Sequence, residues 1–185
     1  MVQGGKSEAP GMAGTSGTNG GRGKAIGWRV MATSLGGMLV AASEAGVCCL
    51  AFGQGEAELA ACFPGSALAP AGDEMDALFA KVLAAVERPG PGAAAIPLDI
   101  EGTAFQRRVW DELRRIPPGE TRSYGELAAA LGKPGASRAV GGANAANRIA
   151  VLIPCHRVVA ADGSLGGYAH GAAIKAELLR RERSG

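Results

Sequence analysis

The sequence predicts an α/β N-terminal domain with a three-stranded antiparallel sheet and helices, followed by a mostly α-helical C-terminal domain with a helix-turn-helix. Three observations predict this architecture. Short apolar runs rich in strand formers lie near the N-terminus and are separated by Gly-containing turns. A stretch rich in Pro, Gly and Ala at residues 89–97 is typical of a linker between domains. After it, apolar residues recur at helical spacing behind two capping boxes.

Length and composition fit such a chain. Its 185 residues include 47% hydrophobic residues, enough to fill a core, and no apolar run reaches membrane-spanning length. The N-terminus lacks the pattern of a secretion signal, so we expect a cytoplasmic protein without a membrane partner. The four Cys lack the paired spacing of a zinc site, and two of them are adjacent. This pattern favours neither a metal centre nor a disulfide framework, and it fits a reducing compartment.

Charge is distributed unevenly along the chain. Residues 101–185 contain 13 Lys and Arg against 8 Asp and Glu, whereas residues 1–100 contain 6 against 9. The second part is therefore the one suited to bind a polyanion, although Lys and Arg often serve only to solvate a surface.

The N-terminal domain is expected to span residues 25–88. Residues 1–24 contain eight Gly and no apolar periodicity, which predicts a disordered tail before it. The expected strands are residues 26–32, 38–43 and 47–52. A short helix from Glu56 to Phe63 follows, and Asp73 is expected to cap a second one. The apolar stripe of that second helix consists of Leu78, Phe79, Val82, Leu83 and Val86.

The C-terminal domain is expected to span residues 98–185 and to begin with two capped helices. Thr103 and Gln106 have capping-box spacing before the first helix, and Ser123 and Glu126 repeat it before the second. A Gly-containing turn then leads into a third helix at about residues 136–146. Two helices joined by such a turn form a helix-turn-helix arrangement.

The third helix contains two Gly in its interior, which is an unusual composition for a helix. Gly141 and Gly142 each cost about 1 kcal/mol relative to Ala in a helix interior, and the residues around them are mostly Ala. Something must therefore approach this helix closely. The alternatives are packing against another helix and close approach to a DNA groove.

One Cys lies in the segment IPCHRVV, residues 153–159, where apolar residues with strand propensity flank it and predict a strand. Most free Cys residues are buried and inert, but Cys155 is followed by His156, one of only two His in the chain. His is a base that can hold a thiol as thiolate. Successive side chains of a strand point to opposite faces, so a contact between these two residues requires a bend in this segment. Cys155 is a candidate nucleophile.

A single carboxylate is expected to face inward near the C-terminus. The last helix is predicted at about residues 172–183, with Ile174 and Leu178 on its inner face. Glu182 lies eight residues after the first and four after the second, and so shares that face. A buried carboxylate needs a partner, whereas a solvated Glu182 would not.

The segment IPCHRVV resembles the acceptor motif of the O6-alkylguanine-DNA alkyltransferases. Residues 99–182 resemble the same family, and residues 26–53 do so more faintly. The resemblance implies a ribonuclease H-like N-terminal domain and a winged-helix-like C-terminal domain. It also implies irreversible, stoichiometric transfer of an alkyl group from O6-alkylguanine, and from O4-alkylthymine, to Cys155. The base would be flipped out through the minor groove, and no cofactor would be needed.

The resemblance also assigns roles at the reactive centre. His156 would activate Cys155 through a water, and Glu182 would orient His156. Tyr124 would help to protonate the departing guanine, and Asn147 would tie the third helix to the active-site turn. Each of three roles has an alternative. Glu182 could be a solvated carboxylate, Tyr124 an ordinary buried Tyr, and Asn147 a helix C-cap.

Further roles concern DNA and the base. Arg138 would take the place of the flipped base, although an Arg at a helix start also suits a phosphate. The residues expected at the groove are Ser137, Ala139, Gly141 and Tyr124. The residues expected to line the guanine pocket are Tyr168 and the backbone of Val158 and Ala169.

Two other classes of function remain open. One is a sensor of alkylated DNA that flips the base without accepting the alkyl group, against which the presence of Cys155 argues directly. The other is a Cys/His hydrolase, for which the sequence shows no oxyanion donors. The expected partner is double-stranded DNA containing O6-alkylguanine, bound by a monomer.

Overall fold

The computed structural model describes residues 23–184. Most of the tail predicted for residues 1–24 therefore lies outside the described residues. Lys24, the last residue of that predicted tail, belongs to the folded part. Its ammonium group contacts the carboxylates of Asp99 at 2.9 Å and Glu101 at 2.6 Å, which lie just beyond the linker.

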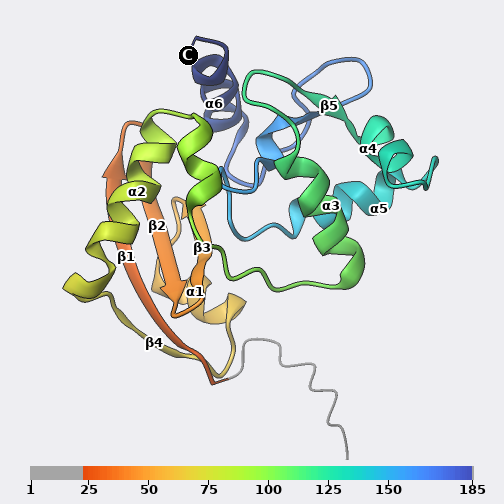
Figure 1. The fold of residues 1–185 in the computed structure, drawn as a ribbon. Coiled ribbons are helices and arrows are strands. Elements are labelled where there is room, and N and C mark those ends of the chain that lie inside the picture. Colours follow the sequence, from red (N-terminus) through yellow and green to blue (C-terminus); the bar gives the residue numbers. More distant parts are fainter. Residues whose placement is uncertain (1–22, 185) are drawn as a thin grey trace, which may run out of the picture.

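The N-terminal half is built on a twisted sheet with strand order β3-β2-β1-β4 (Figure 1). β1 (Ala25–Thr33), β2 (Gly36–Ser43) and β3 (Gly46–Phe52) form the predicted antiparallel meander, which is confirmed. A fourth strand that the sequence did not predict, β4 (Ala67–Pro70), extends the three predicted ones and pairs with β1 in parallel. Its four residues and terminal Pro gave no strand pattern, and Pro is tolerated there because β4 is an edge strand.

Two helices cover opposite faces of this sheet. α2 (Asp76–Glu87) buries Phe79, Val82 and Val86 in the same core cluster as Met38 and Val40 of β2. α1 (Glu56–Cys62) packs Leu59 in a second cluster with Leu39 and Ala41, the alternate residues of that strand. Because successive side chains of β2 point to opposite faces, this strand contributes to the core under α2 and to the core under α1.

The start of α2 differs from the prediction. Asp73 opens a 3₁₀ turn, η1 (Asp73–Met75), and the residue that caps α2 is Met75, without a side-chain hydrogen bond. The interpretation of Asp73 as the cap of this helix is wrong by one turn, because two acidic residues suited to a helix start follow each other within four positions.

The C-terminal half begins after η2 (Pro91–Ala95), a 3₁₀ turn within the linker. Its helices are α3 (Ala104–Arg114), α4 (Tyr124–Ala130), α5 (Ser137–Ala145) and α6 (Ala172–Ser184). Both capping boxes are confirmed. The hydroxyl of Thr103 accepts from Gln106 N at 3.2 Å, and that of Ser123 accepts from Glu126 N at 3.2 Å. α4, the turn and α5 form the predicted helix-turn-helix.

A second, two-stranded parallel sheet lies in this half. β5 (Arg122–Ser123) directly precedes α4 and pairs with β6 (Val158–Val159), the last two residues of the acceptor segment IPCHRVV. The pairing therefore brings the first residue of α4, Tyr124, to the neighbourhood of Cys155.

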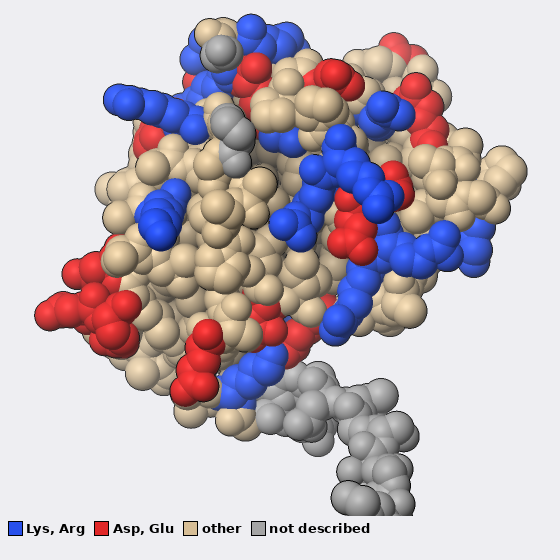
Figure 2. Space-filling model, in the orientation of Figure 1, with Lys and Arg blue, Asp and Glu red and all other residues tan. Residues whose placement is uncertain are grey.

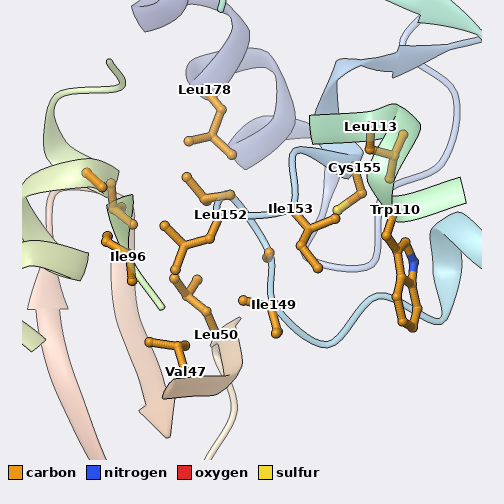
Figure 3. Close-up of a cluster of buried hydrophobic side chains, with 14 of the residues drawn as sticks. Val47, Leu50, Ile96, Trp110, Leu113, Ile149, Leu152, Ile153, Cys155 and Leu178 are labelled. Carbon is orange, nitrogen blue, oxygen red and sulfur yellow. The ribbon is translucent and has the colours of Figure 1, made fainter. Parts of the chain in front are cut away.

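The two halves share one core. β3 would have an open edge, but Leu50 N donates to the Arg148 carbonyl at 2.9 Å and Ala150 N donates to the Leu50 carbonyl at 3.0 Å. Val47 of β3 forms a parallel β-bridge with Leu98 in the same manner. Figure 3 shows Leu50 and Ile149 side by side in a row of apolar side chains that continues to Ile153 and Cys155. The segment that carries Cys155 is thus attached to the N-terminal sheet.

No helix within residues 23–184 combines the length and the apolar character needed to cross a bilayer.

Candidate active site

The acceptor segment forms a tight turn at Cys155 and becomes a strand only at its last two residues. Residues Cys155–Arg157 form a 3₁₀ turn, η3, and strand pairing begins only at Val158. The expectation of an acceptor strand is therefore wrong for Cys155 itself. Pro154 has no N–H for a strand ladder, and its carbonyl accepts instead from Arg157 N at 3.0 Å, which closes the turn. This turn supplies the bend that a strand would lack.

The turn before Cys155 is held by Asn147. Its Nδ2 donates to the Ile153 carbonyl at 2.9 Å, and its Oδ1 accepts from Ile149 N at 3.0 Å. The C-cap of α5 is Ala146, so Asn147 is not a helix cap. Between these anchors Val151 has a φ of 67°, a strained conformation for a β-branched residue. Asn147 fixes a backbone that local preferences alone would not adopt.

His156 and Glu182 form a buried pair behind the thiol. His156 Nε2 lies 2.8 Å from Glu182 Oε1, and both side chains are almost completely buried. An ionised carboxylate only accepts hydrogen bonds, so Nε2 carries the proton and Nδ1 is the basic nitrogen. Within residues 23–184, Nδ1 is buried and has no hydrogen-bond partner. The inward position predicted for Glu182 is confirmed.

Arg157 is the second partner of this carboxylate. Its Nε and Nη2 contact Glu182 at 3.0 Å and 2.7 Å, and its Nη1 donates to the Ile116 carbonyl. Gly119 N completes the set at 3.3 Å. Burial alone would raise the pKa of Glu182, but the bonds from His156 and Arg157 outweigh it and hold the pKa at about 2. Burial lowers the pKa of His156 despite Glu182. The pair is therefore a carboxylate and a neutral imidazole near neutral pH.

The thiol of Cys155 is buried among polar side chains. Burial raises its pKa, while the neighbouring side chains of Asn147 and Tyr168 and the charge of Lys175 act in the opposite direction. The thiol is therefore largely protonated at rest, and its ionisation requires a base. The unpaired Nδ1 of His156 is a base of suitable strength.

Two tyrosines flank the thiol. Burial raises the pKa of Tyr124, and the nearby Cys155 raises it further. Burial and Cys155 likewise raise the pKa of Tyr168, whose hydroxyl is buried without a hydrogen-bond partner in the described part of the chain. Both side chains are therefore neutral hydroxyl donors at the reactive centre, in agreement with the places predicted for them.

Of the residues expected at DNA, Tyr124 begins α4 and the others lie on the first turns of α5. Arg138 and Ala139 are exposed and Ser137 is half-buried. Arg138 has no ion-pair partner among residues 23–184. A Cβ at Gly141 would lie 3.8 Å from the Tyr124 ring, which favours helix packing for that residue. At Gly142 a Cβ would meet nothing within 4 Å, so Gly142 is the glycine that leaves the helix surface open.

Figure 2 shows Lys and Arg side chains gathered mainly over the C-terminal half. The expected uneven distribution of charge is therefore visible on the surface, with acidic side chains interspersed.

The expected pocket residues surround the same centre. The Val158 carbonyl accepts from Lys175 Nζ at 2.6 Å, so one of its two lone pairs is already used. Ala169 is exposed next to Tyr168. The structure thus brings Cys155, His156, Glu182, Tyr124, Asn147, Tyr168 and Val158 together. Ala169 follows Tyr168 in the chain, and Arg138 lies in the first turn of α5.

Comparison with known proteins agrees with this geometry. Residues 26–88 match the family model of the 6-O-methylguanine DNA methyltransferase ribonuclease-like domain, and residues 104–184 match the DNA binding domain of the same proteins. The crystal structure of Mycobacterium tuberculosis O6-methylguanine methyltransferase is 37% identical, with a TM-score of 0.65; the match covers 86% of this chain and 93% of that one. The chain belongs to the O6-methylguanine-DNA methyltransferase family.

Other members of the family extend the comparison. The M. tuberculosis protein OGT in complex with DNA is 36% identical with a TM-score of 0.68, over 85% of this chain and 92% of that one. The Escherichia coli bifunctional transcriptional activator/DNA repair enzyme Ada is 46% identical over 95% of this chain and 50% of Ada. A Mycobacterium leprae methylated-DNA--protein-cysteine methyltransferase is 50% identical over 63% of this chain and 66% of that protein. The chain thus spans half to two thirds of these curated relatives.

Two residues of the site were not singled out from the sequence. Lys175 is completely buried, and its Nζ donates to the carbonyls of Val158 and Leu165. It lies three residues before Leu178 and seven before Glu182, so the helical spacing that identified Glu182 also placed Lys175 on the inner face. Arg157 gave no comparable signal, since its role depends on a carboxylate 25 residues away.

Among the described residues, no group of three or more His, Cys, Asp and Glu side chains could hold a metal ion.

Proposed function

We propose that this protein repairs DNA by irreversible transfer of an alkyl group from O6-alkylguanine, and from O4-alkylthymine, to Cys155, one group per molecule. One observation carries the proposal. The buried thiol of Cys155 lies on a tight turn beside His156, whose Nε2 is held by Glu182 and whose Nδ1 has no partner in the described part of the chain. This arrangement is suited to removing one proton from one thiol.

The transfer is a displacement at a saturated carbon. His156 Nδ1 takes the thiol proton through a bridging water, and Glu182 stabilises the imidazolium that forms. The sulfur then forms a bond to the alkyl carbon as the bond from that carbon to guanine O6 breaks. The electron pair of the broken bond goes to the guanine, which Tyr124 protonates as it leaves. Cys155 ends as a thioether, and no oxidant or cofactor is needed.

The base must leave the duplex to reach a buried thiol. Unstacking costs a few kcal/mol, which interactions at the protein surface have to offset. Arg138 extends from the first turn of α5 without an ion-pair partner among residues 23–184, so its guanidinium is free to occupy the gap in the stack. The small residues that follow it let the helix enter the minor groove. We further propose that the protein acts in the cytoplasm as a monomer on double-stranded DNA.

The direct test is the intact mass of the protein after incubation with a duplex that contains O6-methylguanine. We expect the protein to gain one methyl group, located on Cys155 by peptide mapping, and a second addition of DNA to change nothing. A stable complex with the damaged duplex without a gain in mass would contradict the proposal and would indicate a sensor of alkylated DNA. Repeated turnover would contradict it as well.

Replacement of Arg138 separates base flipping from chemistry. We expect Arg138→Ala to slow methyl transfer from a duplex by about 10- to 100-fold at saturating DNA, because the gap left by the flipped base is no longer filled. Transfer from the free base O6-benzylguanine, which needs no flipping, should stay within about twofold of wild type. Single-turnover rates on both substrates measure the difference.

Lys133→Ala is a matched control for this variant, since Lys133 is an exposed cation in the turn before α5. We expect it to weaken duplex binding without changing the rate at saturating DNA. If Arg138→Ala behaves in the same way, Arg138 binds a phosphate and does not support the flipped base.

A further inference from the structure

The loop that carries Tyr168 is joined to the N-terminal sheet through the imidazole of His170. His170 Nδ1 accepts a hydrogen bond from Phe52 N at 3.4 Å, across a sequence separation of 118 residues. The imidazole also packs edge-to-face on two rings, with centroids 5.6 Å from that of Phe52 and 5.3 Å from that of Tyr168. A row of three rings therefore runs from the end of β3 to the reactive centre.

The other hydrogen bonds of the loop between β6 and α6 hold its backbone. Ala160 N donates to the Ser164 carbonyl and Gly171 N donates to the Tyr168 carbonyl, both within the loop. Lys175 of α6 holds the Leu165 carbonyl. None of these bonds involves the Tyr168 side chain, whose hydroxyl lies near the Cys155 thiol but has no well-formed hydrogen bond within residues 23–184. The position of the ring therefore depends on what packs behind it.

We propose that His170 is a positioning residue for the alkyl transfer, which ties the pocket loop to β3 and so fixes Tyr168 before the base arrives. The inference rests on the function proposed above, because Tyr168 is taken as a wall of the guanine pocket. The tie depends on a neutral imidazole. A protonated imidazole carries a hydrogen on both nitrogens and accepts no bond from Phe52 N.

The surroundings of His170 favour the neutral form. A cavity of about 300 Å3 between the two halves is lined by His170 together with Cys49, Cys62, Gln54 and Arg148. Burial raises the pKa of Cys49 to about 12, so that thiol is neutral. The Tyr168 hydroxyl is neutral too. Arg148 contributes a positive charge, which disfavours a second positive charge on His170. No carboxylate lines this cavity among the described residues.

The direction of the pH effect follows from these contacts. Burial lowers the pKa of His170 from its usual value of 6.5, and the bond that Nδ1 accepts from Phe52 N stabilises the same neutral form. The imidazole is thus neutral at pH 8 and the tie is closed. The tie contributes fully above about pH 6.5, the usual pKa of His. This contribution is lost as the pH falls through the lower pKa that His170 has in the folded protein.

Two substitutions separate the acceptor from the ring. His170→Asn places Oδ1 near the position of Nδ1, so that it keeps an acceptor that does not titrate. His170→Phe keeps the ring and removes the acceptor. For methyl transfer from an O6-methylguanine duplex at pH 8, we expect His170→Phe and His170→Ala to raise the DNA concentration at half-maximal rate by about five- to tenfold, the size of one hydrogen bond. The limiting rate should change by less than about twofold, and His170→Asn should resemble wild type.

The same duplex assay, taken from pH 8 down to the lowest pH at which both proteins stay folded, tests the role of protonation. Over this range wild type should lose affinity by a larger factor than His170→Asn does, since only wild type carries the titrating imidazole. Equal losses in the two proteins would overturn the dependence on protonation. A His170→Phe protein that matches wild type at pH 8, or a His170→Asn protein that matches His170→Ala, would overturn the tie.

Hydrogen exchange at the Phe52 amide provides a readout that is independent of activity. We expect this amide to exchange faster in His170→Phe and His170→Ala than in wild type or His170→Asn, at equal global stability. Unchanged exchange in all three variants would contradict the tie even if the kinetics change. Absence of transfer by wild type would instead contradict the proposed function, and the exchange measurement would still decide on the tie.

Discussion

Cys155→Ser is expected to bind a duplex containing O6-methylguanine and to transfer no methyl group. A serine hydroxyl is barely ionised near neutral pH, and the neutral imidazole of His156 is too weak a base to change this. The rate should fall by at least about 10³-fold. Binding should stay within about threefold of wild type, because α5 and Arg138 form a surface separate from the thiol. Intact mass and gel-shift titration measure the two effects.

Cys62→Ser is the matched control for this variant. Cys62 is half-buried at the end of α1, and its thiol is more accessible than those of Cys48, Cys49 and Cys155. We expect its replacement to leave both transfer and binding unchanged. Methylation of Cys155→Ser, or of any other cysteine of the wild-type protein, would contradict the assignment of Cys155 as the acceptor.

Glu182→Gln is expected to slow transfer by about 10- to 100-fold at pH 7. The carboxylate raises the proton affinity of His156, so its removal leaves a weaker base for the Cys155 thiol. The rate should then recover as the pH rises and the thiol ionises without help. The pH dependence of transfer from O6-benzylguanine measures this, since the free base avoids effects on DNA binding. If the rate of the variant differs from that of wild type by the same factor at every pH, the relay is contradicted.

Glu177→Gln is the matched control on the same helix. The pKa of Glu177 is also held at about 2, in this case mainly by hydrogen bonds from Arg180 and Arg181, but its side chain is partly exposed and pairs with these two arginines instead of His156 and Arg157. Its replacement should leave the rate at pH 7 within about twofold of wild type. Melting curves are needed for both variants, because Glu182→Gln leaves the Arg157 guanidinium without its carboxylate.

Acid should remove part of the stability that this carboxylate provides. The pKa of Glu182 is about 2 in the folded protein and about 4.5 in an unfolded chain, so the contribution is present above pH 4.5 and is lost as the pH falls toward 2.

Local signals in the sequence were sufficient for most of the helices and for the principal nucleophile. Thr103 and Ser123 marked helix starts because a capping box involves residues only three positions apart. Glu182 could be placed inward because helical spacing links it to Leu178 within a single turn. The β1–β2–β3 meander was predictable for the same reason, since each strand pairs with its neighbour in the chain.

The parts that were missed depend on distant residues. β4 pairs with β1 across some forty residues, and its own four residues carry no pattern. The turn at Cys155 replaces a strand because Pro154 and the Asn147 anchors prevail over the strand preference of its neighbours. The hydrogen bond between Phe52 and His170 joins the two halves of the chain and leaves no periodic trace. Spacing within one element cannot reveal such contacts.

The attachment of the acceptor segment to β3 has a consequence for how the molecule unfolds. Without Leu98 and Ile149, the buried strand β3 would expose a row of free backbone groups along an apolar edge, which invites pairing with another chain. The N-terminal sheet is therefore complete only when the C-terminal half is folded onto it. The two halves should lose their structure together, in one cooperative transition, and either half expressed alone should tend to aggregate.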